Sequence, residues 1–216
     1  MKSILLFSLY LHIAAGTLSL IAGPLALFAT KGGQRHILIG KVFLYSMTLV
    51  FFSALFNAIV KEMTFLTMMA VFSYYNILAG IRALYLRRGV QQGWLDVLLH
   101  GTTIVVMGSF LLFGARQFSM GHYPIGFLSF FFGLIGVSNA HGYIKVLRIK
   151  EPRLRRSRLL LSHISGLTGG FIASITAFSV QTMGFMPNVL QWLWPTFVFV
   201  PVIIYWKRKT QLPETT

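Results

Sequence analysis

The chain has 216 residues, of which 56% are hydrophobic and only 11% charged, and its mean hydropathy is +0.72. Soluble domains carry about a quarter charged residues, so the composition excludes that class and favours an integral membrane protein. The absence of cysteine excludes disulfides, thiolate metal sites and iron–sulfur clusters. The net charge of +15 does not indicate a nucleic-acid partner, because the cations lie in short segments between apolar runs, where membrane topology and anionic lipid account for them.

Seven apolar segments follow one another along the chain, each close to the roughly 20 residues that a helix needs to cross the hydrocarbon layer. They cover residues 4–29, 37–60, 64–86, 94–114, 124–147, 158–180 and 189–206. Backbone groups in lipid must be satisfied within a helix or a closed barrel, and runs this long without alternation indicate helices. We therefore expect an all-α, multi-pass bundle of seven transmembrane helices, with residues 1–210 as one transmembrane domain and 211–216 as a flexible tail.

The positive residues between these segments predict the orientation of the bundle. Sixteen of the nineteen Lys and Arg lie after spans one, three and five or in the C-terminal tail. Because positively charged loops stay in the cytoplasm, we expect the N-terminus outside and the C-terminus inside. The largest group, seven cations between Lys145 and Arg158, forms a basic loop in this interpretation. The expected location is the inner (plasma) membrane, with the lipid bilayer as the main partner.

Histidine is the only titratable residue type that recurs inside the spans. His100, His141 and His163 each lie roughly 8–10 Å from the cytoplasmic end of their helix, at about 1.5 Å per residue. His36 enters span two from the same side, whereas His12 lies in the outer half of span one. Ionisable groups inside a bilayer are costly and usually face the bundle interior. We therefore predict a histidine-lined site near the cytoplasmic face.

This set of histidines, with almost no acid nearby, favours a b-type haem held by two neutral imidazoles on facing helices. The candidate ligands are His12, His36, His100, His141 and His163. The cations that suit haem propionates at the cytoplasmic edge are Arg35, Arg82, Lys145 and Arg158. Small residues follow several of the histidines; they let a flat macrocycle approach, although helix packing alone explains most such stripes. The function in this hypothesis is electron transfer or assembly of a respiratory complex, with a quinone or such a complex as partner.

Two other chemistries stay open. A zinc-dependent membrane hydrolase would use His100, His141 and His163 as ligands. Asp96, one helical turn before His100, would be its general base or a fourth ligand. A proton or small-solute carrier would instead use His12, Asn57, Asn76 and the inner histidines as a polar path. The remaining alternative is a structural or accessory protein that performs no chemistry.

The first two spans carry a recognisable pattern of histidines and small residues. Its positions are His12, Gly16, Gly23, Gly33, His36, Gly40, Tyr45 and Met47. Over roughly residues 8–55 the chain resembles a bacterial family of predicted membrane proteins, domain of unknown function 2306. The resemblance implies an integral membrane protein without an established activity, and it adds weight to His12 and His36 as site residues.

Overall fold

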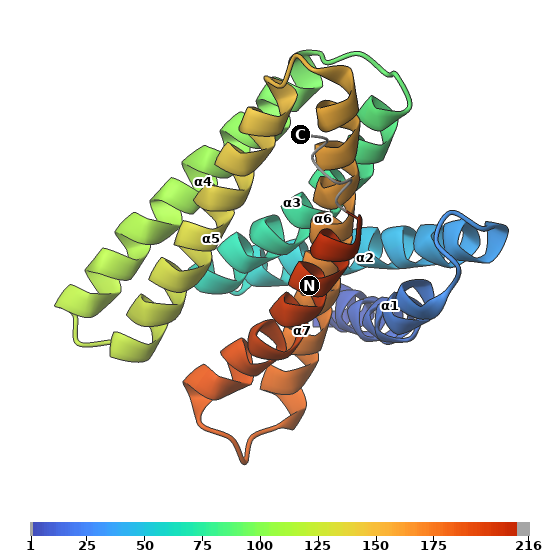
Figure 1. Cartoon of the computed structure of the whole chain (residues 1–216). Helices are drawn as coiled ribbons and strands as arrows, with labels where there is room; N and C mark the ends of the chain where they lie inside the picture. The colour runs from blue at the N-terminus through green and yellow to red at the C-terminus, as the bar shows by residue number, and fades with distance from the viewer. Residues whose placement is uncertain (1, 211–216) are drawn as a thin grey trace.

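The computed structural model describes residues 2–210, without the side chains of residues 206, 207, 209 and 210 (Figure 1). Its helices are α1 (Lys2–Phe28), α2 (Gln34–Val60), α3 (Thr64–Arg87), α4 (Trp94–Ser119), α5 (Tyr123–Leu147), α6 (Pro152–Thr182) and α7 (Asn188–Thr210). All seven are long and apolar enough to cross a membrane, which confirms the expected all-α class and the number of spans. The expected tail, 211–216, lies outside the described residues.

The sixth helix begins at Pro152, so the basic loop predicted to run to Arg158 is much shorter than expected. Proline suits the first turn of a helix, where its missing N–H would have no partner. The carboxylate of Glu151 accepts hydrogen bonds from the backbone amides of Arg153 and Leu154 and so caps the helix. The arginines that follow Pro152 therefore project from the first turns of α6 and are held by that helix.

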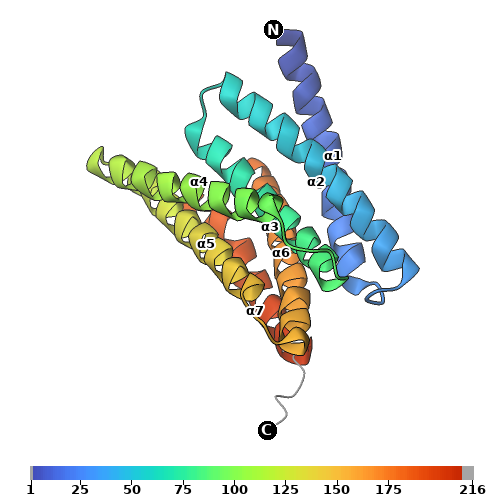
Figure 2. The same cartoon turned by 90° about the horizontal axis from the view of Figure 1, so that it is seen from above.

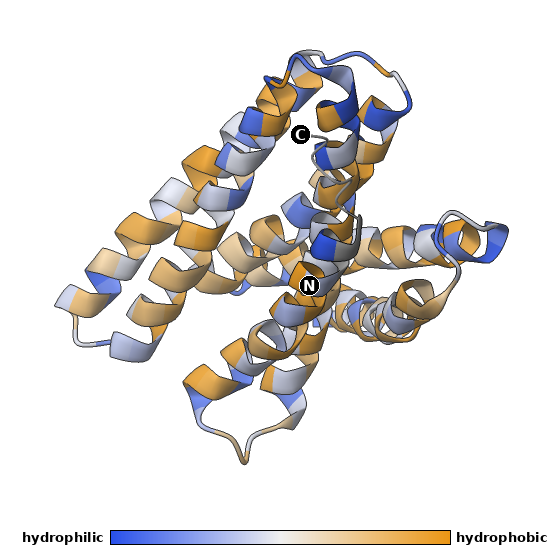
Figure 3. Cartoon of the chain, in the orientation of Figure 1, coloured by the Kyte–Doolittle hydropathy of each residue, from blue (hydrophilic) through white to orange (hydrophobic). Residues whose placement is uncertain are grey.

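Helices α3 and α6 form the centre of the bundle. The α1–α2 hairpin packs on one side of this pair, the α4–α5 hairpin lies on the other, and α7 packs against α6 (Figures 1 and 2). Because consecutive spans alternate in direction, the loops 29–33, 88–93 and 148–151 share one end, which we call the basic end. Figure 3 shows hydrophobic residues along the helices and hydrophilic residues gathered near these loops. The outward orientation of the N-terminus stays a prediction.

The two central helices meet backbone to backbone. A Cβ atom added at Gly166 would press against the carbonyl oxygen of Asn76 and lie 2.8 Å from Cα of Gly80, closer than real side chains allow. The hydrophobic effect does not drive helix association in lipid, because the surrounding hydrocarbon is as apolar as the side chains. Close packing through small residues contributes to that association instead. The small residues that follow His163 on α6, Gly166 and Gly170, both lie against α3 and therefore belong to a helix-packing face.

Gly166→Ala is expected to lower the thermal unfolding midpoint of the detergent-purified protein, because the added methyl group forces α3 and α6 apart. Overpacking of this kind costs about 1–3 kcal/mol. Gly40→Ala is the matched control, since a Cβ atom at Gly40 meets nothing within 4 Å and alanine favours a helix. Equal midpoints for the two variants would show that α3 and α6 do not cross at Gly166.

Candidate functional site

An ion pair joins α3 to α4 near the basic end. Arg82 Nε lies 2.6 Å from Asp96 Oδ1, and Arg82 Nη2 lies 2.8 Å from Oδ2. The backbone amide of Gly93 donates to the same carboxylate at 2.9 Å. The Asp96 side chain is only 2% exposed, and a two-pronged guanidinium contact is an effective way to bury a carboxylate. Asp96, considered above as a general base, and Arg82, considered as a propionate partner, are thus engaged with each other.

His100, one turn further along α4, is enclosed by two tyrosines and is 2% exposed. Its Nδ1 lies 3.0 Å from the Tyr75 hydroxyl group, and its ring stacks on Tyr143 with centroids 5.1 Å apart. The Tyr143 hydroxyl group donates to the carbonyl oxygen of Ala79 on α3. Nε2 of His100 is buried and has no hydrogen-bond partner in the described part of the chain. These contacts join α3, α4 and α5, so His100 fixes the positions of the two tyrosines.

Two of the other predicted histidines bind backbone carbonyl groups of neighbouring helices. His163 Nδ1 lies 3.1 Å from the Gly80 oxygen, and His36 Nδ1 lies 3.0 Å from the Ala26 oxygen. His163 is within electrostatic range of the His36 ring. His141, by contrast, has an exposed side chain on the surface of α5. The structure therefore brings His36 near His163 but leaves His141 apart from both.

The fifth predicted histidine, His12, belongs to a polar contact between α1 and α2. Its Nδ1 lies 3.1 Å from Ser53 Oγ. Nearby, Asn57 Nδ2 donates to Ser8 Oγ at 3.1 Å. Hydrogen bonds between membrane helices of this kind stabilise their packing. His12 and Asn57 thus lie between the first two helices, away from Asn76, with which the carrier hypothesis placed them on one path.

The zinc site considered from the sequence is not assembled. Among residues 2–210, no three His, Asp or Glu side chains are grouped so that they can hold a metal ion. His100 is buried against Tyr75 and Tyr143, His163 contacts the Gly80 carbonyl oxygen, and His141 is exposed on α5, so the similar depth expected from the sequence does not bring the three side chains together. The depth of a histidine along its helix follows from its residue number alone. For three histidines to meet, the helices must also be rotated so that the faces carrying them point toward one another.

A cavity of about 490 Å³ lies between α3, α5, α6 and α7, and we call it the α6 cleft. Arg158 and Thr176 line it on α6, and at about 1.5 Å per residue the stretch between them is about 27 Å long. Ser138, Asn139 and Gly142 line the cleft from α5 and are nevertheless exposed. The cleft is therefore open to its surroundings along α5.

The wall of the α6 cleft changes in character along its length. Toward the basic end it carries most of the charged, amide and hydroxyl groups, namely Arg158, Ser162, Tyr143, Ser165, Asn139 and Asn76. Toward the opposite end it is mainly aromatic and aliphatic, interrupted by two threonines; this part includes Met69, Phe72, Phe132, Ile135 and Ile172. Asn139 Nδ2 donates to Asn76 Oδ1 at 3.0 Å across the cleft wall. The cleft is thus amphipathic along its axis.

Apart from Arg158 and Asn76, which the sequence interpretation named for other roles, the polar lining of the cleft was missed, although α6 carries a signal for it. Arg158, Ser162, Ser165, Gly169 and Thr176 follow one another at i, i+4, i+7, i+11 and i+18, which places them on one helical face. That face carries no histidine, so a search centred on titratable residues passes over it. The periodicity of small and polar residues would have found it.

No protein-family model, curated protein or solved structure matches the chain. The resemblance of residues 8–55 to the family of predicted membrane proteins therefore stays a prediction. The added weight that it placed on His12 and His36 stays a prediction too.

Asp96→Asn and Arg82→Gln are each expected to lower the thermal unfolding midpoint of the purified protein. A hydrogen bond to a charged group contributes about 1.5–3 kcal/mol, and each single change leaves the other charge partly buried without its partner. The double variant should therefore lose less stability than the two single losses added together. Glu62→Gln, at an exposed loop position, serves as the control for loss of an acid. Additive losses would show that the two side chains do not act as a pair.

Proposed function

We propose that this multi-pass membrane protein binds an elongated amphipathic molecule, of the chemical class that includes lipids and lipoquinones, in the α6 cleft. The observation that carries the proposal is a cavity of about 490 Å³ with a mainly apolar lining whose polar groups gather toward one end. Sites for small organic ligands typically measure about 300–1,000 Å³ and place a few polar groups in an apolar lining. The seven apolar helices position this cavity inside the bilayer, where such molecules dissolve.

The head group of the ligand is expected at the basic half of the cleft. Asn139 donates one hydrogen bond there, and no hydrogen bond to its carbonyl oxygen occurs in the described part of the chain. Polar groups at membrane depth are costly unless a partner satisfies them, so a ligand with donors and acceptors gains free energy at this position. Arg158 adds a positive charge at the same half. A head group with acceptor oxygens meets both requirements.

The hydrocarbon chain of the ligand is expected along the opposite half. Phe72 and Phe132 are buried there, and their rings lie 5.5 Å apart between centroids. Ile172 on α6 completes the apolar wall. A flexible chain lying against these side chains replaces membrane lipid that would otherwise fill the cleft, and the open side along α5 lets it enter from the bilayer.

Gly142→Leu tests the proposal, because a Cβ atom at Gly142 meets nothing within 4 Å and the longer side chain adds bulk at a position that lines the cleft. Purified protein in nanodiscs is exposed to a palmitic acid analogue that carries a diazirine, and the photolabelled residues are mapped by mass spectrometry. Labels are expected on the cleft-lining parts of α5 and α6. Gly142→Leu should reduce them about tenfold, which corresponds to a steric cost of about 1.4 kcal/mol.

Gly101→Leu is the matched control, since a Cβ atom at that position of α4 also meets nothing within 4 Å and the residue does not line the cleft. It should label like the unaltered protein. Equal labelling of both variants, or labels spread evenly over the lipid-facing surface, would refute the proposal. Solvent extraction of the purified protein followed by mass spectrometry then identifies the molecule that it carries.

We also propose a narrower form of the haem hypothesis, with His36 and His163 as axial ligands. Each ring directs Nδ1 toward a backbone carbonyl oxygen. This arrangement fixes the tautomer of a ligating histidine and leaves Nε2 free for the iron. Arg87 and Arg88 lie within electrostatic range of His163, where propionates can pair with them.

The haem hypothesis is tested by the absorption spectrum of protein supplied with haem during expression. A Soret band is expected that His36→Ala and His163→Ala abolish and that His141→Ala, at an exposed position on α5, leaves intact. Protein without a Soret band, or a band that all three variants retain, would reject this pair as ligands.

A further inference from the structure

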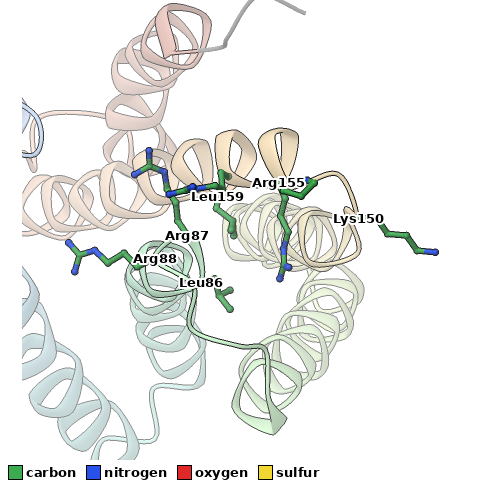
Figure 4. A pocket seen from close by; sticks show the side chains of 9 residues that line it. Leu86, Arg87, Arg88, Lys150, Arg155 and Leu159 are labelled. Atoms are coloured by element: carbon green, nitrogen blue, oxygen red, sulfur yellow. The ribbon is translucent and has the colours of Figure 1, made fainter.

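A second cavity, of about 300 Å³, lies at the basic end between the end of α3 and the start of α6 (Figure 4). Five cationic side chains line it, namely Arg87, Arg88, Lys150, Arg155 and Arg156. Its remaining lining residues are two leucines, a glycine and a proline, so no acid is among them. We call this cavity the basic pocket. It is separate from the α6 cleft, which no residue of the basic pocket lines.

Two of these arginines have buried polar atoms without partners. The Nε atoms of Arg87 and Arg155 are both shielded from solvent, and neither has a hydrogen-bond partner in the described part of the chain. Figure 4 shows Arg87 extending from the end of α3 toward Leu159 of α6, whereas Lys150 extends outward. An unsatisfied buried donor costs about 1–3 kcal/mol, and more when it is charged. Two such donors on facing helices therefore indicate an acceptor that the chain does not supply.

Membrane topology alone does not explain this arrangement. Positive residues that hold a loop in the cytoplasm need only to lie in that loop, and they can remain fully solvated there. Here five of them line one cavity, with Arg88 and Lys150 extending outward from it (Figure 4), and like charges so close together repel one another. The nearest acid in the sequence, Glu151, forms no ion pair with them in the described part of the chain; its carboxylate accepts hydrogen bonds from the first amides of α6.

We propose that the basic pocket binds a phosphate group. Guanidinium groups present planar N–H donors that match two phosphate oxygens at once, and several of them offset its negative charge. Leu86 and Leu159 supply an apolar surface beside the cations, which suits a phosphate attached to an organic group. The pocket lies where two apolar spans end, and basic pockets between membrane helices bind anionic head groups at this level. A phospholipid head group and a soluble phosphate compound share this chemistry.

The test uses the full-length protein in nanodiscs of phosphatidylcholine, with or without phosphatidylglycerol, and native mass spectrometry to count the acidic lipids that stay bound. The double variant Arg87→Gln/Arg155→Gln should bind phosphatidylglycerol about tenfold more weakly, which corresponds to a loss of about 1.4 kcal/mol of binding free energy. The matched control is Arg35→Gln/Lys41→Gln, which removes the same charge at the same end of the bundle outside the basic pocket. It should bind acidic lipid like the unaltered protein.

A second arm distinguishes the source of the phosphate. Inorganic phosphate and glycerol phosphate are added to protein in phosphatidylcholine alone, and the thermal unfolding midpoint is measured. If phosphate raises the midpoint of the unaltered protein but not that of the Arg87→Gln/Arg155→Gln variant, the pocket binds a soluble phosphate compound. If the unaltered protein retains phosphatidylglycerol but its midpoint does not rise with phosphate, the pocket binds lipid. The single variant Arg155→Lys should bind more tightly than Arg87→Gln/Arg155→Gln but more weakly than the unaltered protein. It keeps the positive charge but lacks the planar guanidinium group that can bind two phosphate oxygens.

The proposal is overturned if the pocket and control variants behave alike in both arms, or if the unaltered protein prefers neither phosphate nor acidic lipid. The thermal unfolding midpoint without added phosphate reports whether the pocket variant is folded, independently of the α6 cleft. If the pocket variant is not folded, Arg155→Lys decides instead, and binding as tight as that of the Arg35→Gln/Lys41→Gln control would likewise overturn the proposal. Failure of the basic pocket is thereby distinguished from failure of the cleft.

Discussion

The contact between the backbones of α3 and α6 at Gly80 and Gly166 is the constraint on which the remaining structure depends. It brings the two helices close enough for His163 of α6 to reach the Gly80 carbonyl oxygen. Both cavities lie along the same pair, the α6 cleft on one side and the basic pocket at its end. A bundle without this crossing would lack the shared walls of both cavities, because α3 and α6 each line the α6 cleft and the basic pocket.

The polar groups of the bundle fall into two kinds. Those of the first kind satisfy one another between helices, as Arg82 does with Asp96 and as His12 does with Ser53. They stabilise the packing and leave little capacity for a ligand. Those of the second kind, such as Asn139 in the cleft and Arg87 in the basic pocket, keep donors or acceptors that the described chain does not use. In a bilayer the second kind is the costly one, so it marks the positions where a ligand gains most.

The histidines show why a sequence pattern identifies an unusual residue more readily than its neighbours. The depth of the histidines within the spans and the small number of acidic residues near them can be read from the sequence. Four of the five predicted site residues make polar contacts between helices or across a helix end. The fifth, His141, is exposed. Depth follows from position along one helix, but the direction of a side chain relative to three other helices depends on rotations and crossing angles that hydropathy does not encode.

The sequence by itself determined the helical class, the seven spans and the concentration of cations at alternate loops. These properties depend on the length and polarity of single segments, because each segment must by itself be long and apolar enough to cross the bilayer. Only the tertiary structure decided which polar residues meet: it paired Asp96 with Arg82, enclosed His100 between tyrosines and placed Arg87 and Arg155 on the lining of one cavity. Such pairings join residues from helices whose relative rotation is set by close packing at a few small side chains, and that packing is a property of the assembled bundle.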